Sequence, residues 1–324
     1  MTLLEQIKHP IKEQLNEFDP YFRNAMKSNN RLLTIILNYI LTSKGKQLRP
    51  MLVFLSAKLN GQTNNATFVA ASLIELLHTA TLVHDDVVDE SFQRRGYFSV
   101  FALWRAKISV LVGDYLLAKG LLLAVDNNQF DLLKIVSQAM REIAEGELLQ
   151  LEKSWKLNLD EQLYFEIIRK KTATLIAACT LAGTRSVTDN PELLQQMKLF
   201  GEYTGVAFQI KDDLFDYQIS NLTGKPAGND LQEKKVTLPL MYAIAKAEKH
   251  ERRKILKLVN KKIKSGSDIK QIIDFVIEKD GLTYAISKMN EYKTKALDIL
   301  TNYPDSENKT ALMALVTYTT ERKK

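Results

Sequence analysis

An aspartate pattern that suits cation binding occurs twice in this chain, as DDVVD at residues 85–89 and as DDLFD at residues 212–216. Both segments lie in apolar surroundings with helical spacing, so residues four apart, such as Asp85 and Asp89, fall on one helix face. Like charges at that spacing destabilise a helix by roughly 0.2–0.5 kcal/mol per pair. We therefore predict that both segments bind cations, through Asp85, Asp86, Asp89, Asp212, Asp213 and Asp216.

Magnesium is the cation that fits these carboxylates best. It is typically held by one or two carboxylates together with waters and substrate phosphate oxygens. A calcium EF-hand is excluded, because its alternating Asp-x-Asp-x-Asp-Gly loop is absent from the sequence. A single cluster is more often a helix cap or a solvated helix face. Two clusters on helices can instead face each other across a bundle core and hold a diphosphate between metal ions.

Basic residues that suit phosphate lie near the first cluster. Arg94 and Arg95 follow it directly, and the planar fork of arginine pairs with phosphate oxygens through two hydrogen bonds. Upstream, Lys46 and Arg49 precede Pro50, which favours the first turn of a helix. The positive N-terminus of such a helix is a natural anion site, although an ordinary basic loop is the alternative for this segment taken alone.

Further polar residues that can contact phosphate are spread over the rest of the chain. His78 lies two helical turns before Asp85, where a semi-buried structural histidine is the commoner case. Lys171 falls in an apolar stretch, where a lysine needs an anionic partner or a route to solvent. Each residue is a weak signal by itself, and their order and number make the signal strong. They are His78, Lys171, Thr172, Gln209, Lys225 and Lys235.

The composition is that of a soluble globular protein, with 45% hydrophobic and 26% charged residues among 324. The net charge is +7 and the isoelectric point about 9.1, but no RNA-binding motif or zinc-finger spacing accompanies them. We therefore expect lysine-rich helix faces in solvent and no nucleic-acid partner. Cys179 is the only cysteine, which favours a cytoplasmic location. Asp114 and Lys119 interrupt the longest apolar region, so no run approaches the ~18–20 residues of a membrane span.

Helical periodicity dominates the chain, and no sustained alternation typical of strands appears. We expect helices over residues 2–26, 30–42, 50–60, 65–90, 107–126, 129–154, 160–182, 191–219, 237–263, 268–279, 281–301 and 306–321. Long helices with short connections predict an all-α fold, one helical bundle in a single domain of residues 1–324.

The motifs resemble those of the trans-prenyltransferases, the head-to-tail polyprenyl diphosphate synthases, over nearly the whole chain. The matching segments are GKQLRP at 45–50, HDDVVDE at 84–90, RRG at 94–96, GD at 113–114, KT at 171–172, FQIKDDLFD at 208–216 and the stretch from 224 to 239. Two departures stand out. Gln47 replaces an arginine that is often found there, and Arg105-Ala106 stands where a Gly-Asn pair is common.

The resemblance implies an all-helical isoprenoid-synthase fold, about three magnesium ions with bound diphosphate, and usually a homodimer. It implies that isopentenyl diphosphate is bound by Lys46, Arg49, His78 and Arg95. Magnesium on the allylic diphosphate would be held by Asp85, Asp89 and Asp212, with Asp86, Asp213 and Asp216 near them. The allylic diphosphate itself would be contacted by Arg94, Lys171, Thr172, Gln209, Lys225 and Lys235. The expected catalytic residues are Asp85, Asp89, Lys171 and Asp212.

Product length is expected to depend on residues upstream of Asp85. The resemblance implies that short-chain enzymes carry a bulky aromatic four or five residues before the first aspartate, where this chain has Thr81 and Ala80. At a rise of about 1.5 Å per residue, a plug at Ala80 would lie roughly 7.5 Å below the metal site. Without it, a tunnel can continue past Leu77 and admit an all-trans product of about C30 to C40. Such products serve as quinone side chains and partition into membranes.

Three alternatives stay open. A short-chain synthase would make a farnesyl- or geranylgeranyl-type product. A terpene cyclase would need the first aspartates but no second basic set for isopentenyl diphosphate. A non-catalytic partner subunit of a heteromeric synthase should have lost aspartates or arginines from the motifs, which are intact here.

Overall fold

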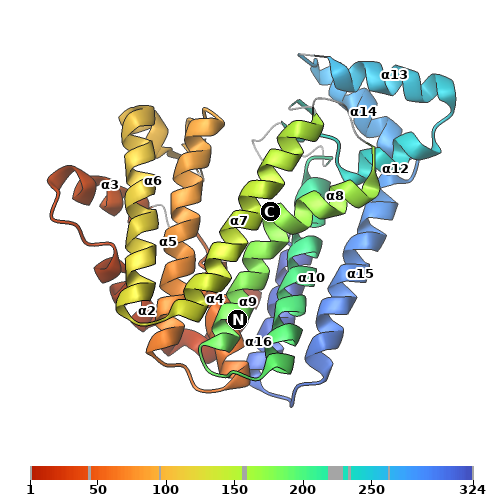
Figure 1. The fold of residues 1–324 in the computed structure, drawn as a ribbon. Coiled ribbons are helices and arrows are strands. Elements are labelled where there is room, and N and C mark those ends of the chain that lie inside the picture. The colour runs from red at the N-terminus through yellow and green to blue at the C-terminus, as the bar shows by residue number, and fades with distance from the viewer. Residues whose placement is uncertain are drawn as a thin grey trace. The chain divides into compact units, whose positions relative to one another are not determined.

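The computed structural model describes residues 2–42, 45–94, 96–154, 159–217, 229–232, 235–261 and 263–322. Within these residues every regular element is helical, apart from one antiparallel hairpin formed by β1 (Gln93–Arg94) and β2 (Tyr97–Phe98). The all-α class predicted from helical periodicity is confirmed (Figure 1).

The chain divides into two compact units. The first consists of Met1–Met140, Ile176–Leu199 and Tyr303–Leu315, and the second of Arg141–Leu175, Phe200–Asn302 and Val316–Lys324. The helices within the first unit are α1 (Leu3–Lys8), the 3-10 helix η1 (His9–Ile11), α2 (Lys12–Ala25), α3 (Arg31–Thr42), α4 (Leu48–Asn60), α5 (Asn65–Val88) and α6 (Val100–Asp126).

The second unit contains α8 (Glu161–Ile168), the π-helical segment η2 (Arg169–Ala173), α11 (Asn229–Gln232), α12 (Leu238–Lys246), α13 (Lys249–Asn260), α14 (Gly266–Glu278) and α15 (Gly281–Thr301). Four helices contain a boundary between the units: α7 (Phe130–Ser154), α9 (Thr174–Arg185), α10 (Pro191–Phe215) and α16 (Glu307–Glu321).

In the first unit, α5 and α6 lie side by side along their length (Figure 1). Their close approach depends on glycine. A Cβ atom added at Gly120 would lie 3.2 Å from Leu77 Cδ2 and 3.3 Å from Leu73 Cδ1. Both leucines are buried, so the apolar face of α5 packs tightly against α6 and positions the aspartates at the end of α5.

By length and composition, α5 and α6 are apolar enough to cross a membrane, contrary to the expectation that no stretch reaches that length. In α5, 61% of the most apolar window is buried inside the protein, and in α6 33% is buried. Two such helices are weak evidence for a span, because the buried core helix of a globular protein passes the same test.

In the second unit, α10 approaches the π-helical segment equally closely. A Cβ atom added at Gly205 would lie 2.4 Å from Ala173 Cα. This approach places the following turn of α10, which carries Gln209, beside Thr172. Around it lies an apolar cluster that includes Tyr164, Ile168 and Leu214.

Several predicted boundaries are wrong. The helix expected over residues 237–263 is two helices, because Ala247 takes an extended conformation and Glu248 begins α13 with a capping box. The helix expected over residues 2–26 is interrupted by the 3-10 turn at Pro10. The helices that carry the aspartates end at Val88 and Phe215, so Asp89 and Asp216 lie just past the helix ends.

Arg105 breaks the regular geometry of α6, which begins earlier than predicted. Its φ of 70° and ψ of 169° lie in a region that almost only glycine occupies. The resemblance noted in the sequence implies that glycine is common at this position. The local departure of this sequence from the family pattern therefore imposes backbone strain, which costs about 1–3 kcal/mol.

Replacing Arg105 with glycine should stabilise the protein. The strained conformation becomes freely accessible, and we expect the free energy of unfolding to rise by about 1 kcal/mol after the entropic cost of glycine. Urea unfolding followed by circular dichroism measures this. Arg105→Ala is the matched control, since it removes the same side chain and keeps the strain. An Arg105→Gly variant no more stable than Arg105→Ala would rule out the strain.

Candidate functional site

The first aspartate cluster closes α5. Asp85 and Asp86 lie in its last turn, and Asp89 is the C-cap, whose N–H donates to the Asp85 carbonyl at 2.8 Å. Asp86 is only 3% exposed, and Arg94 Nε from β1 donates to its Oδ1 at 2.7 Å. Burial raises the pKa of Asp86 against the opposing effect of Arg94, and the charge of Asp89 raises it further.

His84 packs against α6 directly before this cluster. Its Nε2 lies 3.2 Å from the Val110 carbonyl and 3.6 Å from Asp114 Oδ1. A Cβ atom at Gly113 would lie 2.1 Å from that nitrogen, so no other residue fits at position 113 without moving the histidine. Gly113 and Asp114 therefore fix the side chain that precedes the first aspartate.

The upstream basic segment leads into α4. Gln47 is its N-cap and takes a left-handed conformation, with φ at 56°. Gln47 Nε2 donates to Asp19 Oδ1 of α2 at 2.9 Å, so this residue, which replaces the arginine of related proteins, contacts a carboxylate of the fold. Lys46 is exposed in the loop before α4.

Arg49 lies in the first turn of α4 and contacts a carboxylate that the sequence analysis missed. Arg49 Nη2 lies 3.2 Å from Glu75 Oε2 on α5, and both side chains are largely buried. Arg49 Nε is buried without a hydrogen-bond partner. His78 follows Glu75 by three residues on the same helix, so Glu75 and His78 lie on neighbouring turns of one face.

The second aspartate cluster is embedded in a hydrogen-bonded chain. Asp213, 5% exposed, accepts from Tyr164 Oη at 2.7 Å through Oδ2 and from Gln209 Nε2 at 2.8 Å through Oδ1. Thr172 Oγ1 donates to Gln209 Oε1 at 2.6 Å. Burial raises the pKa of Asp213 to about 7, opposed by the bonds from Tyr164 and Gln209.

Asp212 faces a different partner. Arg322, the residue after α16, donates through Nη2 to Asp212 Oδ1. Burial still raises the pKa of Asp212 to about 6, while Arg322 lowers it and Asp230 raises it. The carboxyls of Asp212 and Asp213 therefore both lie where a negative charge is poorly solvated.

Asp216 contacts the segment after the second cluster. The backbone N–H groups of Asp230 and Leu231, at the start of α11, donate to Asp216 Oδ2 at 3.1 and 3.4 Å. Asp230 Oδ1 in turn lies 3.5 Å from Lys235 Nζ. Asp216 thus accepts hydrogen bonds from the start of α11, whose Asp230 pairs with Lys235.

Lys171 lies in the π-helical segment, a distortion that is frequent at functional sites. Its Nζ lies 2.7 Å from Glu147 Oε1 on α7 and donates to Gln150 Oε1 at 3.3 Å. The anionic partner expected for a lysine in this apolar stretch is therefore Glu147.

The residues expected to set product length are all on α5. Ala80 is fully buried and Leu77 nearly so, the latter against Gly120 of α6. Thr81 Oγ1 donates to the His78 carbonyl at 2.8 Å. Nothing bulky stands at positions 80 and 81, as the sequence states.

The donor set of both clusters fits a hard cation. All six aspartates offer oxygen ligands, and burial raises the pKa of Asp86, Asp212 and Asp213. Within the described ranges, no three His, Cys, Asp or Glu side chains converge into a complete cage. Magnesium is typically held by one or two carboxylates together with waters and substrate phosphate oxygens.

The structure thus gathers the predicted residues into local groups: Asp86 with Arg94 in the first unit, and Asp213 with Gln209 and Thr172 in the second. Arg95 and Lys225 lie outside the described residues. Four partners of the predicted site residues were not themselves predicted from the sequence. They lie 24 to 110 positions away from the residues that they contact, and they are Glu75, Glu147, Tyr164 and Arg322. Of these four, only Glu75 could have been noticed in the sequence, because it is a single acidic residue within an otherwise apolar helical stretch.

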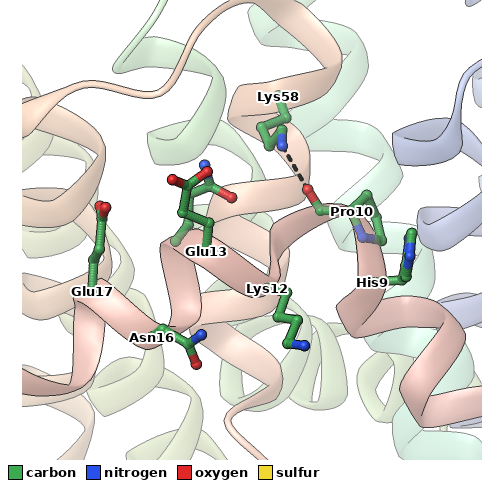
Figure 2. Close-up of a pocket in the computed structure, with 8 residues that line it drawn as sticks. His9, Pro10, Lys12, Glu13, Asn16, Glu17 and Lys58 are labelled. Atoms are coloured by element: carbon green, nitrogen blue, oxygen red, sulfur yellow. Dashed lines mark hydrogen bonds between the residues drawn. The ribbon is translucent and has the colours of Figure 1, made fainter.

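A shallow pocket of about 410 Å³ lies elsewhere, between η1, α2 and α4 (Figure 2). Two of its lining residues are hydrogen-bonded to each other, since Lys58 Nζ donates to the Pro10 carbonyl at 2.5 Å. Its walls contain His9, Glu13 and Glu17 and none of the predicted site residues. The pocket therefore has no part in the constellation described above.

Comparison with known proteins gives consistent findings. The family model described as polyprenyl synthetase matches residues 30–276. An all-trans-nonaprenyl-diphosphate synthase (geranyl-diphosphate specific) of Rhodobacter capsulatus is 36% identical over 323 residues, covering 98% of each chain.

Solved structures agree over the same length. A polyprenyl synthase from Caulobacter crescentus CB15, complexed with calcium and isoprenyl diphosphate, superposes with a TM-score of 0.90 at 33% identity, covering 99% of this chain and 98% of that one. A geranylgeranyl pyrophosphate synthase from Bacteroides thetaiotaomicron superposes with a TM-score of 0.85 at 39% identity, covering 99% of this chain and 100% of that one. The expected all-helical isoprenoid-synthase fold is confirmed.

The raised pKa of Asp213 predicts a pH dependence of stability. The pKa is about 7 in the folded protein and about 3.9 in an unfolded chain, so the folded state binds this proton more tightly. Its contribution is fully present below about pH 4 and is lost as the pH rises through about 7. In EDTA, the free energy of unfolding of Asp213→Asn, measured relative to that of wild type, should therefore increase as the pH rises from about 5 to about 8.

Chemical denaturation at several pH values measures this difference. Asp274→Asn, at an exposed carboxylate of α14, is the control and should keep a constant offset from wild type. If the difference in free energy of unfolding between Asp213→Asn and wild type is also independent of pH, the raised pKa assigned to Asp213 is wrong.

Proposed function

This chain belongs to the polyprenyl synthetase family, and on that premise we propose that it is a magnesium-dependent trans-prenyltransferase. It condenses isopentenyl diphosphate head-to-tail onto an allylic diphosphate and makes a medium- or long-chain all-trans polyprenyl diphosphate. The observation that carries the proposal is the pair of aspartate clusters, each with partly buried carboxyls of raised pKa next to basic or amide side chains.

The two substrates are assigned to two sets of basic residues. Isopentenyl diphosphate is bound by Lys46, Arg49, His78 and Arg95. Arg49 supports this role, because Glu75 orients its guanidinium while its Nε has no partner among the described residues. The allylic diphosphate is bound by Arg94, Lys171, Thr172, Gln209, Lys225 and Lys235.

Magnesium is assigned to Asp85, Asp89 and Asp212, with Asp86, Asp213 and Asp216 in support and about three ions per bound diphosphate. When bound, it neutralises the diphosphate and stabilises it as a leaving group. The Caulobacter protein, whose structure holds calcium and isoprenyl diphosphate, supports a divalent cation beside this ligand class.

The side chains then share the work of the reaction. Arg94 and Lys171 donate to diphosphate oxygens as the allylic C–O bond breaks and leaves a delocalised carbocation. Arg49 and Lys46 hold isopentenyl diphosphate so that its double bond forms the new C–C bond to that cation. The proton lost next passes to the released diphosphate. Apolar helix faces exclude water, which would otherwise trap the cation.

The fold around the site is proposed to act as one domain of residues 1–324, since four helices contain a boundary between the units. We place the protein in the cytoplasm because it has a single cysteine. Its product partitions into membranes and serves as a quinone side chain.

A short-chain activity is the second candidate, favoured by the geranylgeranyl pyrophosphate synthase at 39% identity. The small residues at positions 80 and 81 favour the longer product, because a buried alanine leaves α5 without the bulky plug of short-chain enzymes. A terpene cyclase and a non-catalytic subunit are disfavoured, since the aspartates and the basic residues of both sets are present.

The assignment of two diphosphate sites predicts a split in substrate affinity. Arg49→Gln should raise KM for isopentenyl diphosphate about tenfold or more, and Lys235→Gln should do so for the allylic substrate, because each loses a charge-assisted hydrogen bond. Steady-state kinetics with each substrate varied in turn measures this. The controls are Arg31→Gln and Lys249→Gln, at exposed positions. If both site variants affect the same substrate, the assignment is wrong.

Product length is tested by incubation with farnesyl diphosphate, isopentenyl diphosphate and magnesium, followed by mass analysis. Wild type should yield about C30 to C40, and Ala80→Tyr should yield shorter chains, because a ring roughly 7.5 Å below Asp85 fills the tunnel. Ala144→Tyr, at an exposed helix position, is the control. A short wild-type product, or an unchanged distribution in a folded Ala80→Tyr protein, would contradict this account.

A homodimer is also proposed, formed through α6. Its apolar residues Leu103, Leu111, Leu121 and Leu122 are each more than 40% exposed, and only 33% of its most apolar window is buried. Leu111→Glu should place a charge in that interface and shift the protein towards monomer. Sedimentation velocity distinguishes the states, and a wild-type monomer at micromolar concentration would exclude the dimer.

A further inference from the structure

The side chain of Arg322 lies in a site built by one face of α10. Phe208, Asp212 and Phe215 follow each other at spacings of four and three residues, so they line a single stripe of the helix. The guanidinium carbon of Arg322 lies 4.4 Å from the ring centroid of Phe208 and 5.3 Å from that of Phe215. The Nη2 atom of Arg322 donates to Asp212 Oδ1.

This contact has the features of a specific ion pair. The Arg322 side chain is 18% exposed and that of Asp212 37%, so solvent screens the pair incompletely. Both rings present faces that attract a cation. The main chain of Arg322 continues α16, because its N–H donates to the Tyr318 carbonyl at 3.2 Å, and Lys293 Nζ holds the preceding Glu321 at 2.7 Å.

We propose that Arg322 is a positioning residue for the cation site at Asp212: it pairs with this carboxylate while no metal ion is bound, and a divalent cation must displace it. The inference rests on the proposed function in taking Asp212 as a cation ligand. A guanidinium and a divalent ion repel each other and compete for the same carboxylate lone pairs. Arg322 therefore orients Asp212 beforehand and lowers the apparent affinity for the metal.

Cation binding by the full chain tests the proposal without turnover. We would titrate EDTA-treated protein with Mn²⁺ at pH 8 and measure free Mn²⁺ by electron paramagnetic resonance. Arg322→Gln should bind Mn²⁺ about fivefold or more tightly than wild type, because the competing ion pair and its ring contacts are gone. Arg322→Lys, which keeps the charge, should stay near wild type. Arg253→Gln removes an equal charge from an exposed position of α13 and should change little.

Thermal unfolding gives the second readout. In EDTA, Arg322→Gln and Asp212→Asn should each lower the Tm, and the double variant should lose no more than the larger single loss, since both break one interaction. Saturating Mn²⁺ should raise the Tm of Arg322→Gln by more than that of wild type.

Three results would overturn the inference. Equal Mn²⁺ affinity in Arg322→Gln and wild type, or additive Tm losses in the double variant, shows that Arg322 does not act through Asp212. The absence of any Mn²⁺ binding by both wild type and Arg322→Gln overturns the proposed function together with this inference. The two failures are therefore distinguishable.

Discussion

Carboxylates that are partly or wholly buried at the ends of α5 and α10 are the constraint from which the rest of the site follows. An ionised carboxylate taken out of water costs several kcal/mol unless a cation or hydrogen-bond donors replace the lost solvation. Asp86 and Asp213 are almost inaccessible, and burial raises the pKa of both, with that of Asp213 reaching about 7. A positive charge brought next to either carboxyl would therefore offset part of this cost.

The two clusters meet this constraint differently. The first relies on an arginine from a short hairpin, where Arg94 reaches Asp86. The second relies on neutral donors at Asp213, which accepts from Tyr164 and Gln209, and on Arg322 at Asp212. In both, the third aspartate lies beyond the helix end. Asp89 and Asp216 therefore follow the conformation of the next segment, and the helix positions only the first two carboxyls.

The fold class and the position of the aspartate clusters could be predicted from the sequence, because both depend on the spacing of nearby residues. Helical spacing of apolar residues predicts the all-α fold, which is confirmed. The expectation that the first and third aspartates of each cluster share one helix face was wrong, because α5 ends at Val88 and α10 at Phe215. The π-helical segment at Lys171 carries no such local signal. The split at Ala247 carries one, the capping box of Glu248 with Glu251, but the helical pattern on both sides led to the prediction of a single helix. The partners of the predicted residues were missed because Arg322 and Asp212 are 110 positions apart and only the folded chain brings them together.

Arg105 shows the reverse case, in which the sequence contained a clue whose meaning needed the backbone. The substitution of a common glycine was visible as a departure from the family pattern. Its consequence, a positive φ of 70° inside α6, is apparent only in the structure. The departure at Gln47 is similar, since its left-handed backbone and its bond to Asp19 explain how α4 begins without the usual arginine.

The central claim is that the aspartate clusters bind the cations on which catalysis depends. The most direct measurement is the incorporation of labelled isopentenyl diphosphate against magnesium concentration for wild type, Asp85→Asn and Asp212→Asn. The account predicts no turnover of wild type in EDTA, and a loss of about a hundredfold or more in both variants with helical content retained. Near-normal turnover in either variant, or full activity in excess EDTA, would contradict it.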